Sequence, residues 1–390
     1  MKKNLFSLFF GNEESFNFRI AENAILQRSE KSQFNKRVFG EAKNSSLKSA
    51  TQVKLLILII LFTAMQIFAS LAFGENFTWK REAATLHGLS PEIGEKLHEI
   101  LDKTEDIHAW AFAKDGVIIE DFYRPPYNSE TNFAIQSCSK SITGTLVAIA
   151  IAQGKIKGLD QLAQDFFPDA TAAQKETLKN ITIRHLLTNT SGIAVSDAPN
   201  WTEWRSSANW VEWILNRPAP HYPGQVFSYA TQNTHLLSYI LQKATGERLF
   251  DYAKKNIFDK VGMKSASLSS DAQGIGDGGN GYTLTIEDML RFGQLYLNGG
   301  KWQGEQVVPE YWTRDAGIAH VKRNGGTANY GWQFWVREFN GAATFFAWGW
   351  AGQFIFIIPS KKIVMAFASN HTGSIAVYFN AVRAAIDACK

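Results

Sequence analysis

The stretch FAIQSCSKSITGTLVAIAIAQGKI, residues 133–156, decides how the rest of the chain is interpreted. It places Ser137 three residues before Lys140, and an apolar run then continues to Gly154. The apolar run predicts a buried helix that Gly154 terminates. Side chains three residues apart share one face of a helix, so we expect Ser137 and Lys140 to be neighbours at its start.

This Ser-x-x-Lys pair has two interpretations. A serine in the first turn lies where backbone N–H groups stabilise negative charge, and a lysine inside an apolar helix is desolvated. Desolvation lowers the lysine pKa, so the neutral amine can take the serine proton. The alternative is a capped helix start with a surface lysine. A second Ser-x-x-Lys, from Ser45 to Lys48, shows that the spacing also arises by chance.

Two further segments add to this pair. In PGQVFSYATQNTHLLSYILQKATGERL, residues 223–249, Tyr229 lies in a loop just before a predicted helix. A phenol beside a lysine can act as a base or a proton relay; the alternative is a core tyrosine. In FAWGWAGQFIFIIP, residues 346–359, Gly349 and Gly352 interrupt a strand. Such a strand can approach a ligand and supply oxyanion N–H groups; the alternative is a bulge.

Together these segments resemble the penicillin-recognising serine hydrolases, in particular the branch of class C β-lactamases, family VIII carboxylesterases and 6-aminohexanoate-dimer hydrolases. The resemblance covers about residues 95–388. It includes, in the family's order, QSCSKSITGTLVAIAIAQGKI, IRHLLTNTSGI, PGQVFSYATQNTHLLSYILQKATG, GNGYTLTIEDMLRFGQLYLNGGKWQG and WGWAGQFIFIIP.

The resemblance assigns roles to residues of this chain. It implies that Ser137 is the nucleophile, that Lys140 is its base and that Tyr229 is the tyrosine of the family's Tyr-x-Asn element. It also implies that Gly349, in the segment Trp348–Trp350, is the glycine of the Lys-Thr-Gly or His-x-Gly strand. The oxyanion would then be held by the N–H groups of Ser137 and Trp350. No cofactor or metal is implied.

Two positions depart from the family pattern. Thr231 stands where the family has the Asn of Tyr-x-Asn, and Asn233 lies two residues too far along to replace it. Ala347 stands where the family has Lys or His, so a β-lactam carboxylate would lose a contact of about 1.5–3 kcal/mol. Both departures favour an esterase or amidase over an efficient β-lactamase. The alternatives are a D-alanyl peptidase or weak β-lactamase, and a degenerate member that binds cell-wall peptide without turnover.

The distribution of predicted elements indicates the fold class. Residues 107–124 alternate around Lys-Asp-Gly and predict a hairpin, and residues 341–370 predict two or three strands. Residues 158–275 read as mostly helical. We therefore expect an α/β (α+β) domain with one sheet built from both ends of residues 75–390 and a helical insertion. The resemblance implies a β-lactamase/transpeptidase-like antiparallel sheet flanked by helices.

The N-terminal part predicts an extracytoplasmic protein. Residues 53–74, VKLLILIILFTAMQIFASLAFG, carry no charge after Lys54 and read either as a signal peptide or as a membrane anchor. Either interpretation places residues 75–390 in the periplasm or outside the cell, with membrane contact only through this segment. Residues 1–52 are polar and are expected to be disordered or to lie before the true start site.

Other binding classes find little support. The nine Lys or Arg and five Asp or Glu of residues 1–52 account for the whole net charge of +4, so no basic nucleic-acid surface is expected. GDGGNG, residues 276–281, matches a dinucleotide fingerprint but follows a poor strand. The two cysteines, Cys138 and Cys389, are not expected to pair, and the eight histidines show no metal-binding spacing. Trp201 and Trp204 are expected to line a substrate cleft; the alternative is that they fill the core. The expected partner is a small ester or amide, and no protein partner is expected.

Overall fold

The computed structural model describes residues 77–323 and 326–389. The two N-terminal segments, residues 1–52 and 53–74, lie outside this part, so their assignment and the extracytoplasmic location stay predictions. Within the described residues, no helix combines the length and the apolar character needed to cross a membrane.

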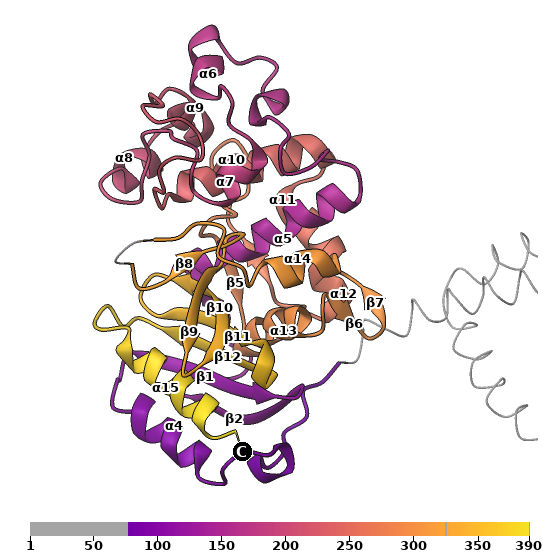
Figure 1. The fold of residues 1–390 in the computed structure, drawn as a ribbon, viewed down its shortest axis with the longest axis vertical. Coiled ribbons are helices and arrows are strands. Elements are labelled where there is room, and N and C mark those ends of the chain that lie inside the picture. Colours follow the sequence, from indigo (N-terminus) through magenta and orange to yellow (C-terminus); the bar gives the residue numbers. More distant parts are fainter. Residues whose placement is uncertain (1–76, 324–325, 390) are drawn as a thin grey trace, which may run out of the picture. The chain divides into compact units, whose positions relative to one another are not determined.

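A seven-stranded antiparallel sheet joins the two ends of the described chain (Figure 1). Its order is β2-β1-β12-β11-β10-β9-β8. The predicted hairpin supplies the first two strands, and its Asp115-Gly116 turn has positive φ angles of 52° and 83°. The strands are β1 (Ile107–Lys114), β2 (Val117–Tyr123), β8 (Asn329–Tyr330), β9 (Trp335–Phe339), β10 (Ala342–Gly349), β11 (Gln353–Ile358) and β12 (Ile363–Ser369). The sheet expected from both ends is therefore confirmed, while β8 and β9 were not predicted.

Side chains alternate along the strands, which divides the core into two layers. On β12, Ile363, Met365 and Phe367 face a layer that includes helices α4 (Ile93–Leu101) and α15 (Ala376–Asp387). The intervening residues of β12 face the layer that includes α5 (Ser139–Ala152) and α13 (Ile286–Leu297). The sheet is thus flanked by helices on both faces, as the fold class predicts.

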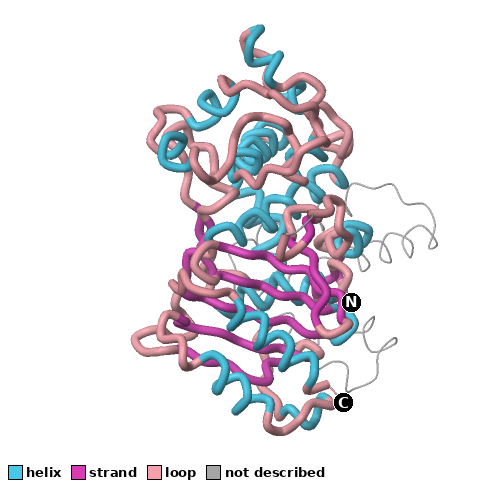
Figure 2. Tube along the Cα trace, turned by 60° about the vertical axis from the view of Figure 1, so that its left-hand side comes forward, coloured by secondary structure: helices cyan, strands magenta, loops and turns pink. Residues whose placement is uncertain are grey.

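Residues 158–275 form the mostly helical part of the chain. Figure 2 shows these helices gathered in one half of the described region and the large sheet in the other. The α- and 3₁₀-helices are η3 (Ala163–Phe166), α6 (Ala172–Thr177), α7 (Ile183–Leu187), α8 (Trp201–Arg205), α9 (Trp210–Leu215), α10 (Thr231–Thr245), α11 (Leu249–Ala253) and α12 (Asp259–Val261), with a π-helical turn at Lys254–Phe258. Gly246 ends α10 with φ +73°, a left-handed conformation that suits glycine.

Short elements complete the description. They are the 3₁₀ turns η1 (Ala84–His87), η2 (Gln136–Cys138) and η5 (Pro359–Lys361), helix α14 (Glu310–Asp315), a three-stranded sheet of β3 (Phe133–Ala134), β5 (Tyr282–Leu284) and β4 (Ser267–Leu268), and the pair β6 (Lys301–Trp302) and β7 (Glu305–Gln306). Thr285 caps α13 by accepting the N–H of Asp288 at 3.1 Å. Both cysteines are free.

Candidate active site

Ser137 lies in the 3₁₀ turn η2, directly before helix α5. The residue before it, Gln136, has a left-handed φ of 48°, which is uncommon for a residue with a side chain. Such strained backbone gathers at functional sites, where the surrounding structure holds it in place. The turn leaves Ser137 half-buried at the start of the buried helix.

Lys140 lies beside Ser137 and is almost completely buried, with 1% of its surface exposed. Its Nζ donates hydrogen bonds to three oxygens: Ser137 Oγ (2.7 Å), Thr231 Oγ1 (2.7 Å) and the Gly279 carbonyl (2.9 Å). Burial lowers the pKa of Lys140 from 10.5 to about 8, although the carboxylates of Asp197 and Asp277 act in the opposite direction. Roughly a tenth of the lysine is therefore neutral at pH 7, and about half of it at pH 8.

Tyr229 lies just before α10, with its ring centroid 5.0 Å from Lys140 Nζ. Burial raises the pKa of Tyr229 well above its ordinary value, and a hydrogen bond with Ser137 only partly offsets this. The ring stacks on Trp335 with centroids 5.3 Å apart. A phenol in this setting stays protonated, so it can relay a proton but does not serve as an anionic base.

Thr231, the first residue of α10, contacts Lys140. Its hydroxyl accepts from Lys140 and donates to Asp197 Oδ2 at 3.0 Å, while its N–H donates to Asp197 Oδ1 at 2.7 Å. The sequence analysis missed Asp197. No motif marks this residue, because it reaches α10 from a loop more than thirty positions upstream.

Strand β10 ends against the turn that carries Ser137. A Cβ atom on Gly349 would lie 2.5 Å from the carbonyl oxygen of Ile135, so only glycine allows this approach. Trp348 is half-buried between Trp335 and Phe354, whose ring centroids lie 5.3 Å and 5.7 Å away. Trp350 follows on the surface, with 68% of its side chain exposed. Ala347 is buried in the core.

The two tryptophans that were predicted to line a cleft differ in their burial. Trp204 has no exposed surface, so the prediction that it lines a cleft is wrong. Its ring packs against Trp210 and His235, with centroids 4.9 Å and 5.7 Å away, which makes it a core residue. Trp201 is half-buried, and its role as a cleft residue stays a prediction.

The glycine-rich segment 276–281 also reaches this site, through the Gly279 carbonyl. The sequence analysis considered this segment only as a nucleotide site. The signal that could have identified it was the run of glycines itself, since glycine permits close contact between backbone and neighbouring helices. Across residues 77–323 and 326–389, no three His, Cys, Asp or Glu side chains group in a way that could hold a metal.

Comparisons with known proteins identify the family of this chain. A family model described as Beta-lactamase matches residues 108–390. The curated 6-aminohexanoate-dimer hydrolase of Paenarthrobacter ureafaciens is 22% identical over 236 residues, which cover 57% of this chain and 58% of that protein. The D-aminopeptidase of Gluconobacter oxydans (strain 621H) is 32% identical over 96 residues, which cover 25% of this chain and 16% of that protein. The chain thus matches less than two thirds of the length of either relative.

Solved structures share the fold. A penicillin-binding protein from Bacillus halodurans has a TM-score of 0.61 and 19% identity, over 74% of this chain and 98% of that one. EstCE1, described as a hydrolase with promiscuous acyltransferase activity, has a TM-score of 0.63 and 18% identity, over 75% of this chain and 98% of that one. Since the family model matches well over half of the sequence, the chain belongs to the β-lactamase family of serine hydrolases.

Proposed function

We propose that this protein cleaves an ester or amide bond through an acyl-enzyme on Ser137. The observation that carries the proposal is the 2.7 Å hydrogen bond between Lys140 Nζ and Ser137 Oγ at the start of a buried helix. The pKa of Lys140, lowered by burial to about 8, makes a neutral amine available at this position. A neutral amine in hydrogen-bond contact can accept the hydroxyl proton while the oxygen attacks a carbonyl.

The proposed reaction has two halves. Ser137 Oγ bonds to the substrate carbonyl carbon as its proton passes to Lys140, and the N–H groups of Ser137 and Trp350 hold the oxyanion. The bond to the leaving group then breaks, and Tyr229 passes the proton from Lys140 to that group. In the second half, water adds to the acyl carbon as its proton passes to the same base. The bond between that carbon and Ser137 Oγ then breaks, Lys140 returns the proton to Oγ, and the acid product departs.

The proposed substrate is a small ester or amide that needs no cation on β10. Ala347, which the resemblance aligns with the family's Lys or His, is apolar and buried. The names of the matched relatives, an aminohexanoate-dimer hydrolase and a D-aminopeptidase, support amide chemistry, and EstCE1 supports a broader hydrolase. We expect p-nitrophenyl esters to be hydrolysed much faster than the β-lactam nitrocefin. Rapid nitrocefin turnover would favour the cell-wall peptidase or β-lactamase alternative.

A fluorophosphonate probe tests the assignment of the nucleophile. Wild-type protein should be labelled on Ser137, and Ser137→Ala should not be labelled. The matched control is Ser139→Ala, because the Ser139 hydroxyl accepts the N–H of Tyr282 at 3.2 Å and has no proposed chemical role. If the wild type labels no more than Ser137→Ala, the chain is a binding protein without turnover.

A further inference from the structure

The loop of residues 271–281, between β4 and β5, contacts the segment that carries Ser137. Three side chains join the two segments. Lys140 Nζ donates to the Gly279 carbonyl (2.9 Å), Thr143 Oγ1 donates to the Gly278 carbonyl (2.7 Å), and Asn280 Nδ2 donates to Gln136 Oε1 (3.0 Å). The loop therefore contacts the base and also the strained residue that precedes the nucleophile.

The loop packs too closely for side chains. A Cβ atom on Gly279 would lie 2.5 Å from Thr231 Cγ2, and one on Gly278 would lie 2.4 Å from Thr143 Oγ1. Glycine loses more conformational entropy on folding than any other residue, so this backbone needs external support to keep one position. The structure provides that support at two aspartates of the loop.

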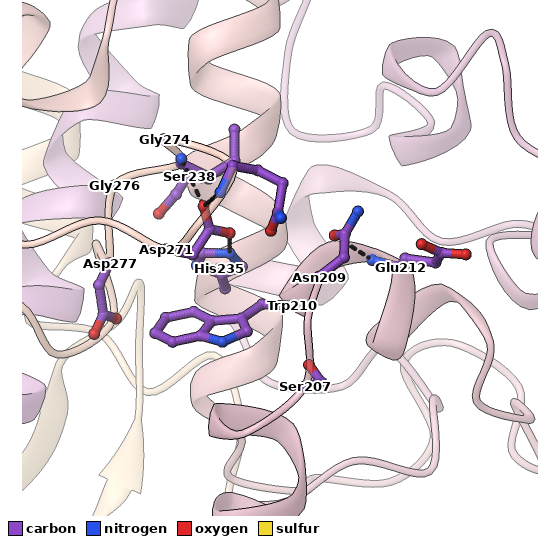
Figure 3. A network of polar contacts seen from close by, with 12 residues as sticks. Ser207, Asn209, Trp210, Glu212, His235, Ser238, Asp271, Gly274, Gly276 and Asp277 are labelled. Carbon is purple, nitrogen blue, oxygen red and sulfur yellow. Dashed lines mark hydrogen bonds and ion pairs between the residues drawn. The ribbon is translucent and has the colours of Figure 1, made fainter.

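The first support is a buried pair between helix α10 and the loop. His235 Nε2 lies 3.0 Å from Asp271 Oδ2, and neither side chain is exposed (Figure 3). The other oxygen of Asp271 accepts the N–H groups of Gln273 and Ile275 at 2.9 Å and 2.8 Å, which shapes the turn. His235 lies one turn after Thr231, so the helix that holds Lys140 also holds the loop.

The second support is an ion pair with helix α8. The Arg205 guanidinium donates to Asp277 Oδ2, and 1% of the Asp277 side chain is exposed. The guanidinium carbon lies 4.0 Å from the ring centroid of Trp210 and 5.2 Å from that of Trp201, so the arginine is fixed between aromatic rings. Asp277 lies two residues before Gly279, which contacts Lys140.

We propose that His235 and Arg205 are positioning residues of this active site. They hold Asp271 and Asp277, and thereby keep Gly279 and Asn280 against the segment that carries Ser137. The inference rests on the proposed function, and neither residue touches a reacting atom.

Release of the loop would also change the charge balance at Lys140. The ionisable groups that face its ammonium are Asp197 in the loop before α8, Asp277 in the glycine-rich loop, Cys138 in its own segment and the Tyr229 phenol. The Gly279 carbonyl and the Asp277 carboxylate both favour the protonated form. A displaced loop removes both contacts and also lessens the burial of Lys140, which is the main cause of its lowered pKa, so the rise of kcat/KM with pH should move from its wild-type midpoint.

The test compares His235→Leu with His235→Gln in the full chain, because glutamine can keep a donor near Asp271. Rates are measured per active site after fluorophosphonate titration. We expect His235→Leu to lose about tenfold or more in plateau kcat and to shift the pH midpoint of kcat/KM, whereas His235→Gln should restore both toward the wild-type values. The matched control is His98→Leu, which removes a similar pair with Asp102 (2.9 Å) on α4 and should change neither quantity.

The inference also predicts which results would contradict it. A His235→Leu protein with the wild-type rate per site and midpoint would overturn the inference, even if its melting temperature falls. If His235→Leu does not fold, Asn280→Ala takes its place: an about tenfold loss of kcat supports the inference, and an unchanged kcat overturns it.

Hydrogen exchange separates this inference from the proposed function. Backbone amides of residues 271–281 should exchange faster in His235→Leu than in wild type, and equal exchange would overturn the inference. This readout does not need activity, so a wild type that fails to label at Ser137 would end the proposed function alone.

Discussion

Thr231 Oγ1 accepts a hydrogen bond from Lys140 Nζ at 2.7 Å. The same hydroxyl donates to Asp197 Oδ2 at 3.0 Å, so a threonine fills the place where the family resemblance leads one to expect an asparagine. A hydroxyl both accepts and donates, which allows it to connect the lysine to a carboxylate. The departure at position 231 therefore keeps a polar partner for the base.

Replacement of Thr231 by valine should reduce kcat/KM. Valine has the same shape but leaves Lys140 and Asp197 without their shared partner, at a cost of about 1–2 kcal/mol, or roughly tenfold. Thr231→Ser keeps the hydroxyl and should retain most activity. Steady-state ester hydrolysis by both variants checks this, and equal activity of Thr231→Val and wild type would contradict the role of the hydroxyl.

The pH dependence of kcat/KM should follow the charge on Lys140. Protonated lysine cannot accept the Ser137 proton, so activity should rise with pH, with a midpoint at about 8. The Asp197 carboxylate raises the pKa of Lys140, so Asp197→Asn should move the midpoint to lower pH. Profiles from pH 6 to 10 measure both, and a midpoint that moves upward in Asp197→Asn would refute the electrostatic interpretation.

Lys140 should also make the stability of the protein depend on pH. Its pKa is lowered from 10.5 to about 8 in the folded protein, so between these values the unfolded chain binds a proton that the native chain does not. Unfolding free energy should therefore rise with pH across this window, by roughly 3 kcal/mol in total. Lys140→Met lacks this contribution. Urea unfolding at pH 7 and pH 10 measures the unfolding free energy of the wild type and of Lys140→Met. The stability advantage of the wild type over the variant should be smaller at pH 7 than at pH 10, or the variant should be the more stable protein at pH 7.

Substitutions of two glycines, Gly341 directly before β10 and Gly349 at its end, should distinguish an effect on activity from an effect on stability. Gly349→Ala places a methyl group 2.5 Å from the Ile135 carbonyl oxygen, so strand and nucleophile turn must move apart. We expect an about hundredfold loss of kcat. Gly341 has φ +76° and open space around it, so Gly341→Ala introduces backbone strain without a clash. It should lower the melting temperature and leave kcat unchanged; equal losses of kcat in both variants would exclude a specific role for Gly349.

The sequence predicted the elements whose signals are local. The 107–124 hairpin depends on Asp115 and Gly116, which adopt the positive φ angles that such turns require. The buried helix of residues 139–152 follows from its apolar run. Strands β8 and β9 were missed because β8 has only two residues and β9 includes the charged pair Arg337 and Glu338.

The site was predictable only where a motif marks it. The contact between Ser137 and Lys140 follows from helical spacing, and Thr231 was noticed only as a missing asparagine. Asp197, Gly279 and Asn280 come from loops, and each reaches the site through a contact that no periodicity encodes. The error at Trp204 has the same origin, because its burial depends on contacts with Arg205 and Trp210 that no periodicity encodes.

The order of the strands in the sheet limits how early the protein can become active during its synthesis on the ribosome. β1 pairs with β12 in a register that joins Ala109 to Ala368, so β1 lacks this neighbour until residues 363–369 have been synthesised. The turn of Ser137 likewise waits for β10, more than two hundred residues later. Contacts this distant in sequence form slowly, since a long loop must close first. The nascent chain should therefore remain inactive, with the edge of β1 unpaired, until β10 and β12 have emerged from the ribosome.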